Sequence, residues 1–301
     1  MHPFPTPEWP IARPGRAAHL QPTVSRDGAP APTAGPRWRL DDIDFSRLDH
    51  ARIADNEALF YLLISASFVE SGSDLYTRNL VDHYAGHPAI GDWLRDHWEH
   101  EELQHGRAFA AYVQAAWPAF PWQTAFDSFI AEYGALCTTE ALEDDRTLEL
   151  AARCVVETGT TSYYQTLRGL SDEPVLQTLL GHIRADEVSH YKHFLAYFKQ
   201  LRAERPVARW RVARVLARRL QEIRDSDSDV ALRHVWAHKG RLFPHDAARI
   251  EDITARLYPL VSRGLPAHQA VRMLLKPMAL PHWLEARLER PLAALARRVM
   301  S

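Results

Sequence analysis

Two short motifs of one type are the residues of this chain best suited to chemistry. Each is a glutamate followed three residues later by a histidine: Glu102 and His105 in "HEELQHG", and Glu187 and His190 in "DEVSH". Residues three apart lie on one face of a helix, so each pair can present a carboxylate and an imidazole to the same point. A single pair is weak evidence, because roughly one is expected by chance in a chain of this composition.

Two isolated glutamates make the pattern more specific. Glu70 lies 32 residues before Glu102, and Glu157 lies 30 residues before Glu187, each within an otherwise apolar or small stretch. A carboxylate on a core-facing stripe is costly unless it is paired or bound to a metal. Four carboxylates and two imidazoles are the ligand set of a di-iron or di-manganese centre inside a helix bundle. The alternative is a set of ordinary surface ion pairs.

Four long helices must bring these side chains together. The apolar pattern predicts helices over about residues 58–87, 89–117, 139–170 and 174–205, with the longest connection between the second and the third. No run of strand-like alternation competes with them. We therefore expect an all-α protein, built as a ferritin-like four-helix bundle with a di-metal core plus a C-terminal helical extension.

Composition and charge divide the chain into three parts. Residues 1–38 are rich in proline and lack periodicity, which predicts a disordered leader. Residues 39–205 are the predicted bundle, and residues 206–301 are a predicted basic helical extension. From the first residue to residue 205 the chain carries 18 Lys and Arg against 29 Asp and Glu, whereas the extension carries 18 against 9. This asymmetry indicates two parts with different surroundings.

The totals exclude several classes of protein. Only 2 cysteines occur among the 301 residues, which argues against a disulfide framework and a thiolate metal site. No uninterrupted apolar run is long enough to span a bilayer, and no signal-peptide core is evident, so we expect a cytoplasmic protein. The basic residues form no recognisable nucleic-acid module, so no nucleic-acid partner is expected.

The motifs resemble those of the ferritin-like di-iron carboxylate superfamily, which includes the soluble acyl-carrier-protein desaturases and the ribonucleotide reductase small subunit. "EELQHG" is similar to the Glu-Glu-x-x-His-Gly stretch of the desaturases, and "ADEVSHY" to their Ala-Asp-Glu-x-x-His. The resemblance covers residues 45–203. It implies two iron ions, with manganese–iron or manganese as alternatives, and six ligands: Glu70, Glu102, His105, Glu157, Glu187 and His190.

The resemblance also implies residues that support the ligands. Asp186 would orient the ring of His105, and Glu101 would orient that of His190. The alternative for both carboxylates is a solvated charge on a helix. His193, one turn beyond His190, is either an additional ligand or an exposed or hydrogen-bonded histidine.

Two further side chains are candidates for the wall of a substrate pocket. Thr161 and Tyr164 follow Glu157 by four and seven residues. The alternatives are close packing of a small residue for Thr161 and a core aromatic for Tyr164. Apolar residues near the ligands, such as Phe109 and Phe194, favour an apolar or acyl substrate.

The expected function follows from the implied metal centre. The resemblance implies a non-haem di-iron oxidase or oxygenase that takes dioxygen, electrons from an unidentified donor and a small organic or acyl substrate, which it hydroxylates, desaturates or N-oxygenates. The alternative is a ferritin-like iron or manganese store, or a peroxide scavenger. The basic segment 207–223 either contacts a membrane surface or a carrier protein, or packs on the bundle. Ferritin-like bundles commonly pair, so a homodimer is also expected.

Overall fold

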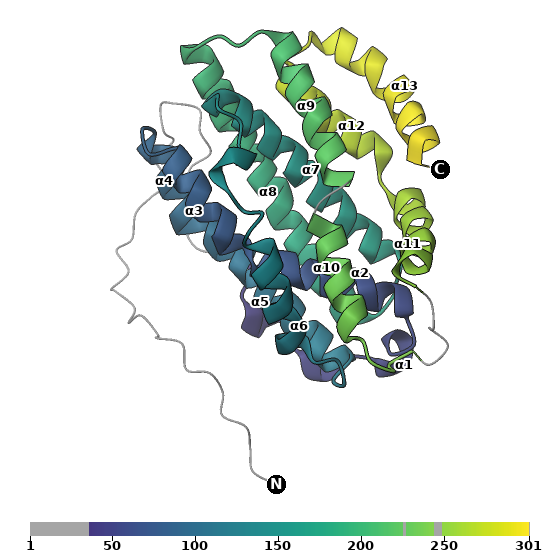
Figure 1. Cartoon of the computed structure of the whole chain (residues 1–301). Helices are drawn as coiled ribbons and strands as arrows, with labels where there is room; N and C mark the ends of the chain where they lie inside the picture. Colours follow the sequence, from purple (N-terminus) through teal and green to yellow (C-terminus); the bar gives the residue numbers. More distant parts are fainter. Residues whose placement is uncertain (1–35, 225–226, 244–248, 301) are drawn as a thin grey trace.

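The computed structural model describes residues 36–224, 227–243 and 249–300. Helices make up the regular structure of these ranges, and no strand occurs in them (Figure 1). The all-α class predicted from the sequence is confirmed. None of the helices in the described ranges is both long enough and apolar enough to cross a membrane.

Four long helices form the central bundle. They are α2 (Glu57–Ser71), α5 (Glu99–Ala116), α7 (Arg146–Gly169) and α8 (Pro174–Glu204). Helix α2 packs on α5 and α7 packs on α8, while contacts between α5 and α8 join the two pairs. The connection between the pairs, residues 117–145, contains α6 (Trp122–Tyr133). Two helix pairs joined by one long crossover are the predicted ferritin-like arrangement.

Two segments predicted as continuous helices are interrupted. The first divides at Gly72 into α2 and α3 (Ser73–His83). Helix α6 packs against this break, since Ile130 Cδ1 lies 3.0 Å from where a Cβ on Gly72 would be. The second begins with α4 (Pro88–Trp93), passes through a π-helical turn at Leu94–Trp98 and continues as α5. Such single π-helical turns are frequent near functional sites, and this one directly precedes the first Glu-x-x-His motif.

Side-chain caps fix where the bundle helices start. Asn56 accepts a hydrogen bond from the backbone N–H of Leu59 at the start of α2, and Asp145 caps α7 in the same way. At the start of α8 the cap is Glu173, which is completely buried. Its carboxylate also accepts the hydroxyl of Tyr112 from α5, at 3.0 Å. These caps satisfy backbone donors that would otherwise have no partner, and Glu173 ties α8 to α5.

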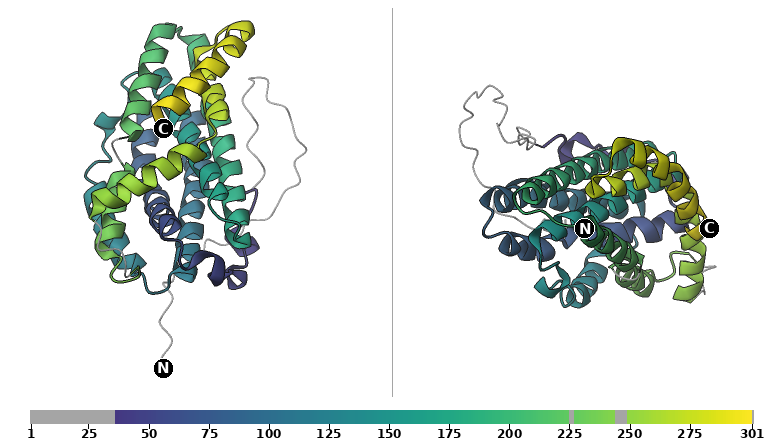
Figure 2. Two further views of the ribbon diagram at one scale, coloured as in Figure 1. Left: turned by 90° about the vertical axis from the view of Figure 1, so that its right-hand side faces the viewer. Right: turned by 90° about the horizontal axis from the view of Figure 1, so that it is seen from above.

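The C-terminal part wraps around the bundle. It comprises α9 (Arg209–Arg224), α10 (Asp227–His238), α11 (Ile250–Gly264), α12 (Ala267–Leu275) and α13 (His282–Met300). Helices α9, α11 and α12 pack on α7, whereas α10 packs on α2 and α6. Figure 2 shows these green-to-yellow helices lying against the bundle. Val230, Ala231 and Val235 of α10 are buried in the same core as α2, so residues 206–301 do not form a separate unit.

The chain joins the bundle before residue 39, which is earlier in the sequence than the predicted boundary between leader and bundle. Residues 1–35 lie outside the described residues. Trp38, which the sequence placed at the end of the leader, is 3% exposed and packs its ring against those of His105 and His182. The described chain therefore contacts the bundle before residue 39.

Candidate metal centre

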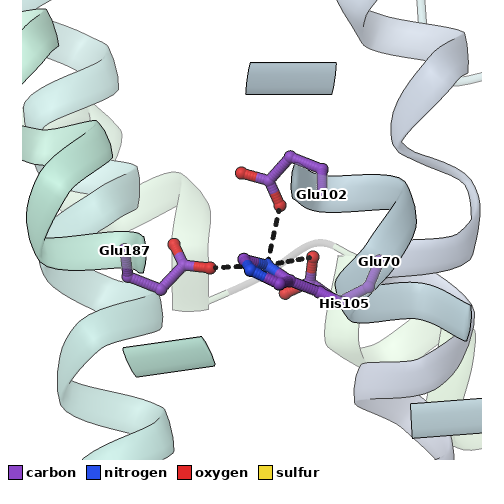
Figure 3. Close-up of side chains that lie close together, drawn as sticks. All are labelled: Glu70, Glu102, His105 and Glu187. Carbon is purple, nitrogen blue, oxygen red and sulfur yellow. Dashed lines mark ion pairs between the residues drawn. The ribbon is translucent and has the colours of Figure 1, made fainter. Parts of the chain in front are cut away.

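The six side chains expected as metal ligands converge in the middle of the bundle. They form two groups in which one ligand atom of each residue lies within 4.8 Å of the others: Glu70, Glu102, His105 and Glu187, and Glu102, Glu157, Glu187 and His190. Figure 3 shows the first group. None of the six is more than 4% exposed. Glu102 and Glu187 belong to both groups, which is the arrangement of two adjacent cation sites bridged by two carboxylates.

Each histidine presents its Nδ1 atom to three carboxylates. His105 Nδ1 lies 3.2 Å from Glu187 Oε1, 3.6 Å from Glu102 Oε2 and 3.8 Å from Glu70 Oε2. These side chains come from α2, α5 and α8, so the packing of three helices sets the distances.

The second histidine has a matching environment. His190 Nδ1 lies 3.1 Å from Glu102 Oε1, 3.7 Å from Glu157 Oε2 and 4.0 Å from Glu187 Oε2. Here α5, α7 and α8 supply the side chains. Taken with the first group, one glutamate from each of α2 and α7 and one Glu-x-x-His pair from each of α5 and α8 face the same space.

The opposite ring nitrogens contact the two carboxylates that the sequence analysis paired with them. His105 Nε2 lies 3.0 Å from Asp186 Oδ2, and His190 Nε2 lies 2.7 Å from Glu101 Oε2. A neutral imidazole that donates its Nε2–H to a carboxylate carries its lone pair on Nδ1. Both lone pairs therefore point into the cluster of glutamates, which is the orientation that a metal ligand requires.

Several buried atoms at the centre have no hydrogen-bond partner among the described residues. They are His105 Nδ1, His190 Nδ1, Glu157 Oε2 and Glu187 Oε1. Buried polar atoms without partners are costly, and an imidazole lone pair close to carboxylate oxygens is repelled unless a proton or a metal ion lies between them. Two divalent ions would satisfy these atoms and balance the four carboxylates. Hard oxygen and imidazole donors fit iron or manganese, so the residues present fit a di-metal group.

Burial and mutual repulsion shift the pKa values of the cluster when no cation is bound. Burial, followed by repulsion from neighbouring carboxylates, raises the pKa of Glu70 and Glu157 well above the usual range. Burial lowers the pKa of His105 and His190, but hydrogen bonds to the surrounding carboxylates outweigh it and raise both pKa values. Burial also opposes ionisation of Glu102, yet its contacts with both imidazoles bring its pKa below the usual range. The metal-free cluster thus retains protons that metal ions would displace.

Two residues that the sequence analysis assigned to the leader hold Asp186 in place. Trp38 donates its Nε1–H to Asp186 Oδ2 at 2.6 Å, and Arg37 donates its Nε–H to Oδ1, also at 2.6 Å. Burial raises the pKa of Asp186, but its contacts with His105, Trp38 and Arg37 outweigh that effect and lower it to about 2. The signal in the sequence was the change from proline-rich chain to "RWRL" at residues 37–40.

The two expected pocket residues lie elsewhere. Thr160, and not Thr161, lines the cavity at the cluster, and it donates its hydroxyl to Glu187 Oε2 at 2.7 Å. Thr161 is completely buried, and its hydroxyl has no partner among the described residues. The packing of α7 on α8 sets this register, and residues three and four beyond Glu157 are equally compatible with the sequence pattern. Tyr164 is not part of the cavity wall but donates its hydroxyl to Glu70 Oε1.

His193 lies outside both groups of candidate ligands. Its ring stacks on Trp93 with the centroids 4.9 Å apart, and its Nδ1–H donates to the backbone carbonyl of Ser189 at 3.0 Å. Trp93 also lies edge-on to His190, at 6.4 Å between centroids. In this structure His193 is therefore a hydrogen-bonded histidine that packs beside the centre.

A cavity of about 850 Å³ extends from the centre to the surface, and its inner end is lined by the four glutamates. Apolar and aromatic residues form part of the wall: Val69, Tyr76, Leu80, Trp98, Tyr133 and Val156. Arginines form another part: Arg153 of α7, Arg218 and Arg219 of α9, and Arg233 of α10. Neither Phe109 nor Phe194 lines it; both are fully buried in the core. The cavity is thus more polar than the apolar neighbours of the ligands suggested.

Comparison with known proteins gives a distant structural likeness. No protein-family model and no curated protein matches the sequence. Solved structures of R2-like ligand-binding oxidase variants align over 88% of this chain and 89% of theirs, at 16%, 17% and 18% identity and TM-scores of 0.43, 0.44 and 0.41. Those structures contain a reconstituted manganese–iron cofactor. Because these TM-scores are below 0.5, the assignment of the centre rests on its own geometry.

Proposed function

We propose that this protein is a non-haem di-metal oxidase or oxygenase that uses dioxygen to oxidise an organic substrate. The observation that carries the proposal is the pair of overlapping ligand groups, which share Glu102 and Glu187 and leave both histidine Nδ1 atoms without a hydrogen-bond partner in the part of the chain that the structure describes. In this proposal Glu70 and His105 complete one metal site. Glu157 and His190 complete the other.

The protein residues would fix the centre rather than react themselves. Two redox-active ions bound there would pass electrons from the substrate and from an external donor to dioxygen, so that dioxygen is reduced and the substrate oxidised. Asp186 and Glu101 hold the two imidazoles in the tautomer that a metal needs. Thr160 holds one oxygen of Glu187. The near-complete burial of the ligands within the bundle strengthens their electrostatic contacts.

The size of the cavity favours an enzyme over a store. A cavity of about 850 Å³ lies within the range of small-molecule sites, whereas the passage of single ions requires much less space. The wall contains both apolar and charged side chains, so an organic molecule can be held and oriented there. We propose iron as the metal, with manganese–iron or manganese as the alternatives that the donor set also suits.

Metal titration tests the proposal directly. Metal-free protein is titrated anaerobically with Fe(II) and, separately, with Mn(II), and the bound ions are counted. We expect about two ions per chain in the wild type and at most one in Glu102→Gln or Glu187→Gln, because each substitution removes a ligand shared by both sites. Glu99→Gln is the matched control, since Glu99 lies on α5 but belongs to neither group.

Dioxygen consumption separates the enzyme from the alternatives. Iron-loaded protein is mixed with dioxygen, a chemical reductant and candidate organic substrates, and uptake of dioxygen and oxidised products are measured together. Stoichiometric oxidation of an organic substrate supports the proposal. Binding of fewer than two ions by the wild type contradicts it. Accumulation of ferric ions far beyond two per chain, without oxidised product, identifies a store.

A further inference from the structure

We propose that the cavity binds a small organic carboxylate, and that Arg153 holds its anionic group one helical turn from the metal centre while Arg219 adds positive charge beside it. This inference rests on the proposed function, because it names the class of substrate that the same site takes. Nothing in the sequence pattern of the ligands requires these arginines. They are contributed by different parts of the chain, Arg153 by α7 of the bundle and Arg219 by α9 of the C-terminal extension.

Arg153 is a buried arginine whose guanidinium has unused hydrogen-bond donors. It is 8% exposed and lines the cavity. Its Nε–H donates to Glu149 Oε1 at 2.8 Å, and this is the one hydrogen bond that the Arg153 side chain makes to the described residues. A guanidinium carries five N–H donors in a planar fork, so the two terminal nitrogens remain available. These two nitrogens are not among the buried atoms that lack a partner, so they are open to the cavity, where an anionic ligand could accept from them.

Arg219 increases the positive charge at the same place. The carboxylate of Glu149, which is completely buried, lies 3.7 Å from Arg219 Nη2, so one buried carboxylate faces two guanidinium groups. Its second oxygen also accepts the backbone N–H of Glu143 at 2.8 Å. Arg219 is itself held by the chain, since its Nη1 lies 3.2 Å from Glu222 Oε2 and its Nη2–H donates to the backbone carbonyl of Ala141 at 3.3 Å. Because both guanidinium groups contact the carboxylate of Glu149, the two cations lie close together, and burial with the charge of Arg153 lowers the pKa of Arg219.

The position of Arg153 sets what the bound molecule presents to the metals. Arg153 and Glu157 are four residues apart on α7, about 6 Å along the helix axis, and both line the cavity. The loop residues Glu143 and Asp144, which precede α7, line the cavity on the far side of Arg153. The arginine therefore lies between the metal centre and the part of the wall formed by the loop. A carboxylate held there would place its first few carbon atoms beside the ligands.

The wall favours a monoanion with an organic body. The cavity wall that contains Arg153 and the glutamates also contains apolar and aromatic side chains, including Tyr76, Leu80 and Trp98. The carboxylates of the nearby loop disfavour a ligand with two negative charges. Arginine forms paired hydrogen bonds with planar carboxylates, which fixes both the position and the orientation of the ligand. Arg153 and Arg219 are positioning residues in this account.

Calorimetric binding to the full chain tests the inference. Hexanoate and the uncharged hexanamide are titrated into metal-free protein and into protein loaded with Mn(II) under anaerobic conditions. We expect the wild type to bind hexanoate at least tenfold more tightly than hexanamide. Loss of a hydrogen bond to a charged group corresponds to about a tenfold to hundredfold loss of affinity, so Arg153→Met should abolish this preference and leave hexanamide binding unchanged.

Arg153→Met leaves Glu149 buried without its main partner, so this variant can fold poorly. Two further variants test the inference in that case. The double variant Glu149→Gln, Arg153→Met removes both charges and should bind the two ligands equally. Arg153→Lys keeps the charge but loses the planar fork, and should retain a reduced preference for hexanoate. Arg146→Gln is the matched control, since Arg146 is an exposed arginine of α7 outside the cavity wall, and should behave as the wild type.

The outcomes separate this inference from the proposed function. Hexanoate binding that depends on Arg153 in metal-free protein supports the anion site, whatever the number of metal ions bound. Protein that loads two Mn(II) ions but binds both ligands equally overturns the anion site and leaves the metal centre intact. Equal weakening of both ligands in Arg153→Met, or a hexanoate preference that needs Mn(II) and ignores Arg153, also overturns it.

Discussion

The residues that contact His105 and His190 from outside the cluster determine which ring nitrogen of each imidazole faces the glutamates. The imidazoles of His105 and His190 present Nδ1 because a carboxylate lies at hydrogen-bond distance from Nε2. Asp186 is in turn fixed by Trp38 and Arg37. The orientation of one metal ligand therefore depends on a chain of contacts that reaches residues outside the bundle helices.

Asp186→Asn should weaken metal binding at the His105 site about 10-fold to 100-fold, because the amide cannot hold the imidazole as a carboxylate does. Competition with a chelator, monitored by the spectroscopic signal of Mn(II), measures the affinity of each site. Asp92→Asn is the control, since the exposed Asp92 contacts only Arg95 among the described side chains. An unchanged affinity in Asp186→Asn would show that its contact with His105 is irrelevant to the metal.

The adjacent threonines 160 and 161 should respond in opposite ways to substitution by valine. Thr160→Val removes the hydroxyl that donates to Glu187 and should destabilise the fold by about 1 kcal/mol. Thr161→Val removes a buried hydroxyl without a partner among the described residues, and should be neutral or stabilising. Urea unfolding of the metal-free protein measures both. Equal effects would mean that the contact with Glu187 contributes nothing.

At the scale of helices, the distance between α2 and α5 sets how closely Glu70 and His105, candidate ligands of the first proposed metal site, approach each other. Gly106 follows His105 on α5, and a Cβ there would lie 2.7 Å from the Cα atom of Ser71, which follows Glu70 on α2. The two backbones can approach this closely only because residue 106 has no side chain. The glycine that ends the "HEELQHG" motif thus brings the ligands of two helices together.

Gly106→Ala should push α2 and α5 apart, lower the free energy of unfolding by about 1–3 kcal/mol and weaken binding of the metal between Glu70 and His105. Thermal unfolding and Mn(II) titration measure the two effects. Gly169→Ala, at the exposed end of α7, is the control because nothing lies within 4 Å of its added Cβ. Helix propensity predicts that the control is slightly stabilised. Comparable losses in both variants would contradict a specific role for the close approach.

For the whole molecule, the C-terminal extension completes both the core and the cavity. Helix α10 buries Val230, Ala231 and Val235 in the core shared with α2, and α9 contributes Arg218 and Arg219 to the cavity wall. Arg218 is ion-paired with Glu143 of the loop before α7. The bundle predicted as residues 39–205 therefore lacks part of its own core when taken alone.

Removal of residues 206–301 should abolish cooperative thermal unfolding, because the apolar faces of α2, α6 and α7 would lose their cover. Circular dichroism and calorimetry of the truncated chain test this. Removal of residues 282–301 is the control: α13 packs on α11 and α12, outside the bundle, so a cooperative transition should remain. A bundle of residues 1–205 that unfolds as sharply as the full chain would show that it is an independent domain.

The spacing of Glu70, Glu102, His105 and their counterparts in the second half determined the all-α class and the convergence of six side chains. Helical periodicity fixes which residues share a face, and carboxylates on apolar faces require a common partner. The helices could be predicted because each depends on residues within a few turns of one another, whereas the capping residues Asn56, Asp145 and Glu173 were identified in the structure.

Only the tertiary structure decided which side chains from distant segments meet. Trp38 reaches Asp186 across 148 residues of sequence, and Arg219 reaches Glu149 across 70. The choice of Thr160 over Thr161 also depends on how α7 is rotated against α8, and neighbouring positions on a helix give the same local pattern. The sequence determined the candidate ligands because the two Glu-x-x-His pairs follow a helical period. The residues that position these ligands, and the cavity beside them, depend on how helices and loops pack against one another. No periodic pattern in the sequence encodes that packing.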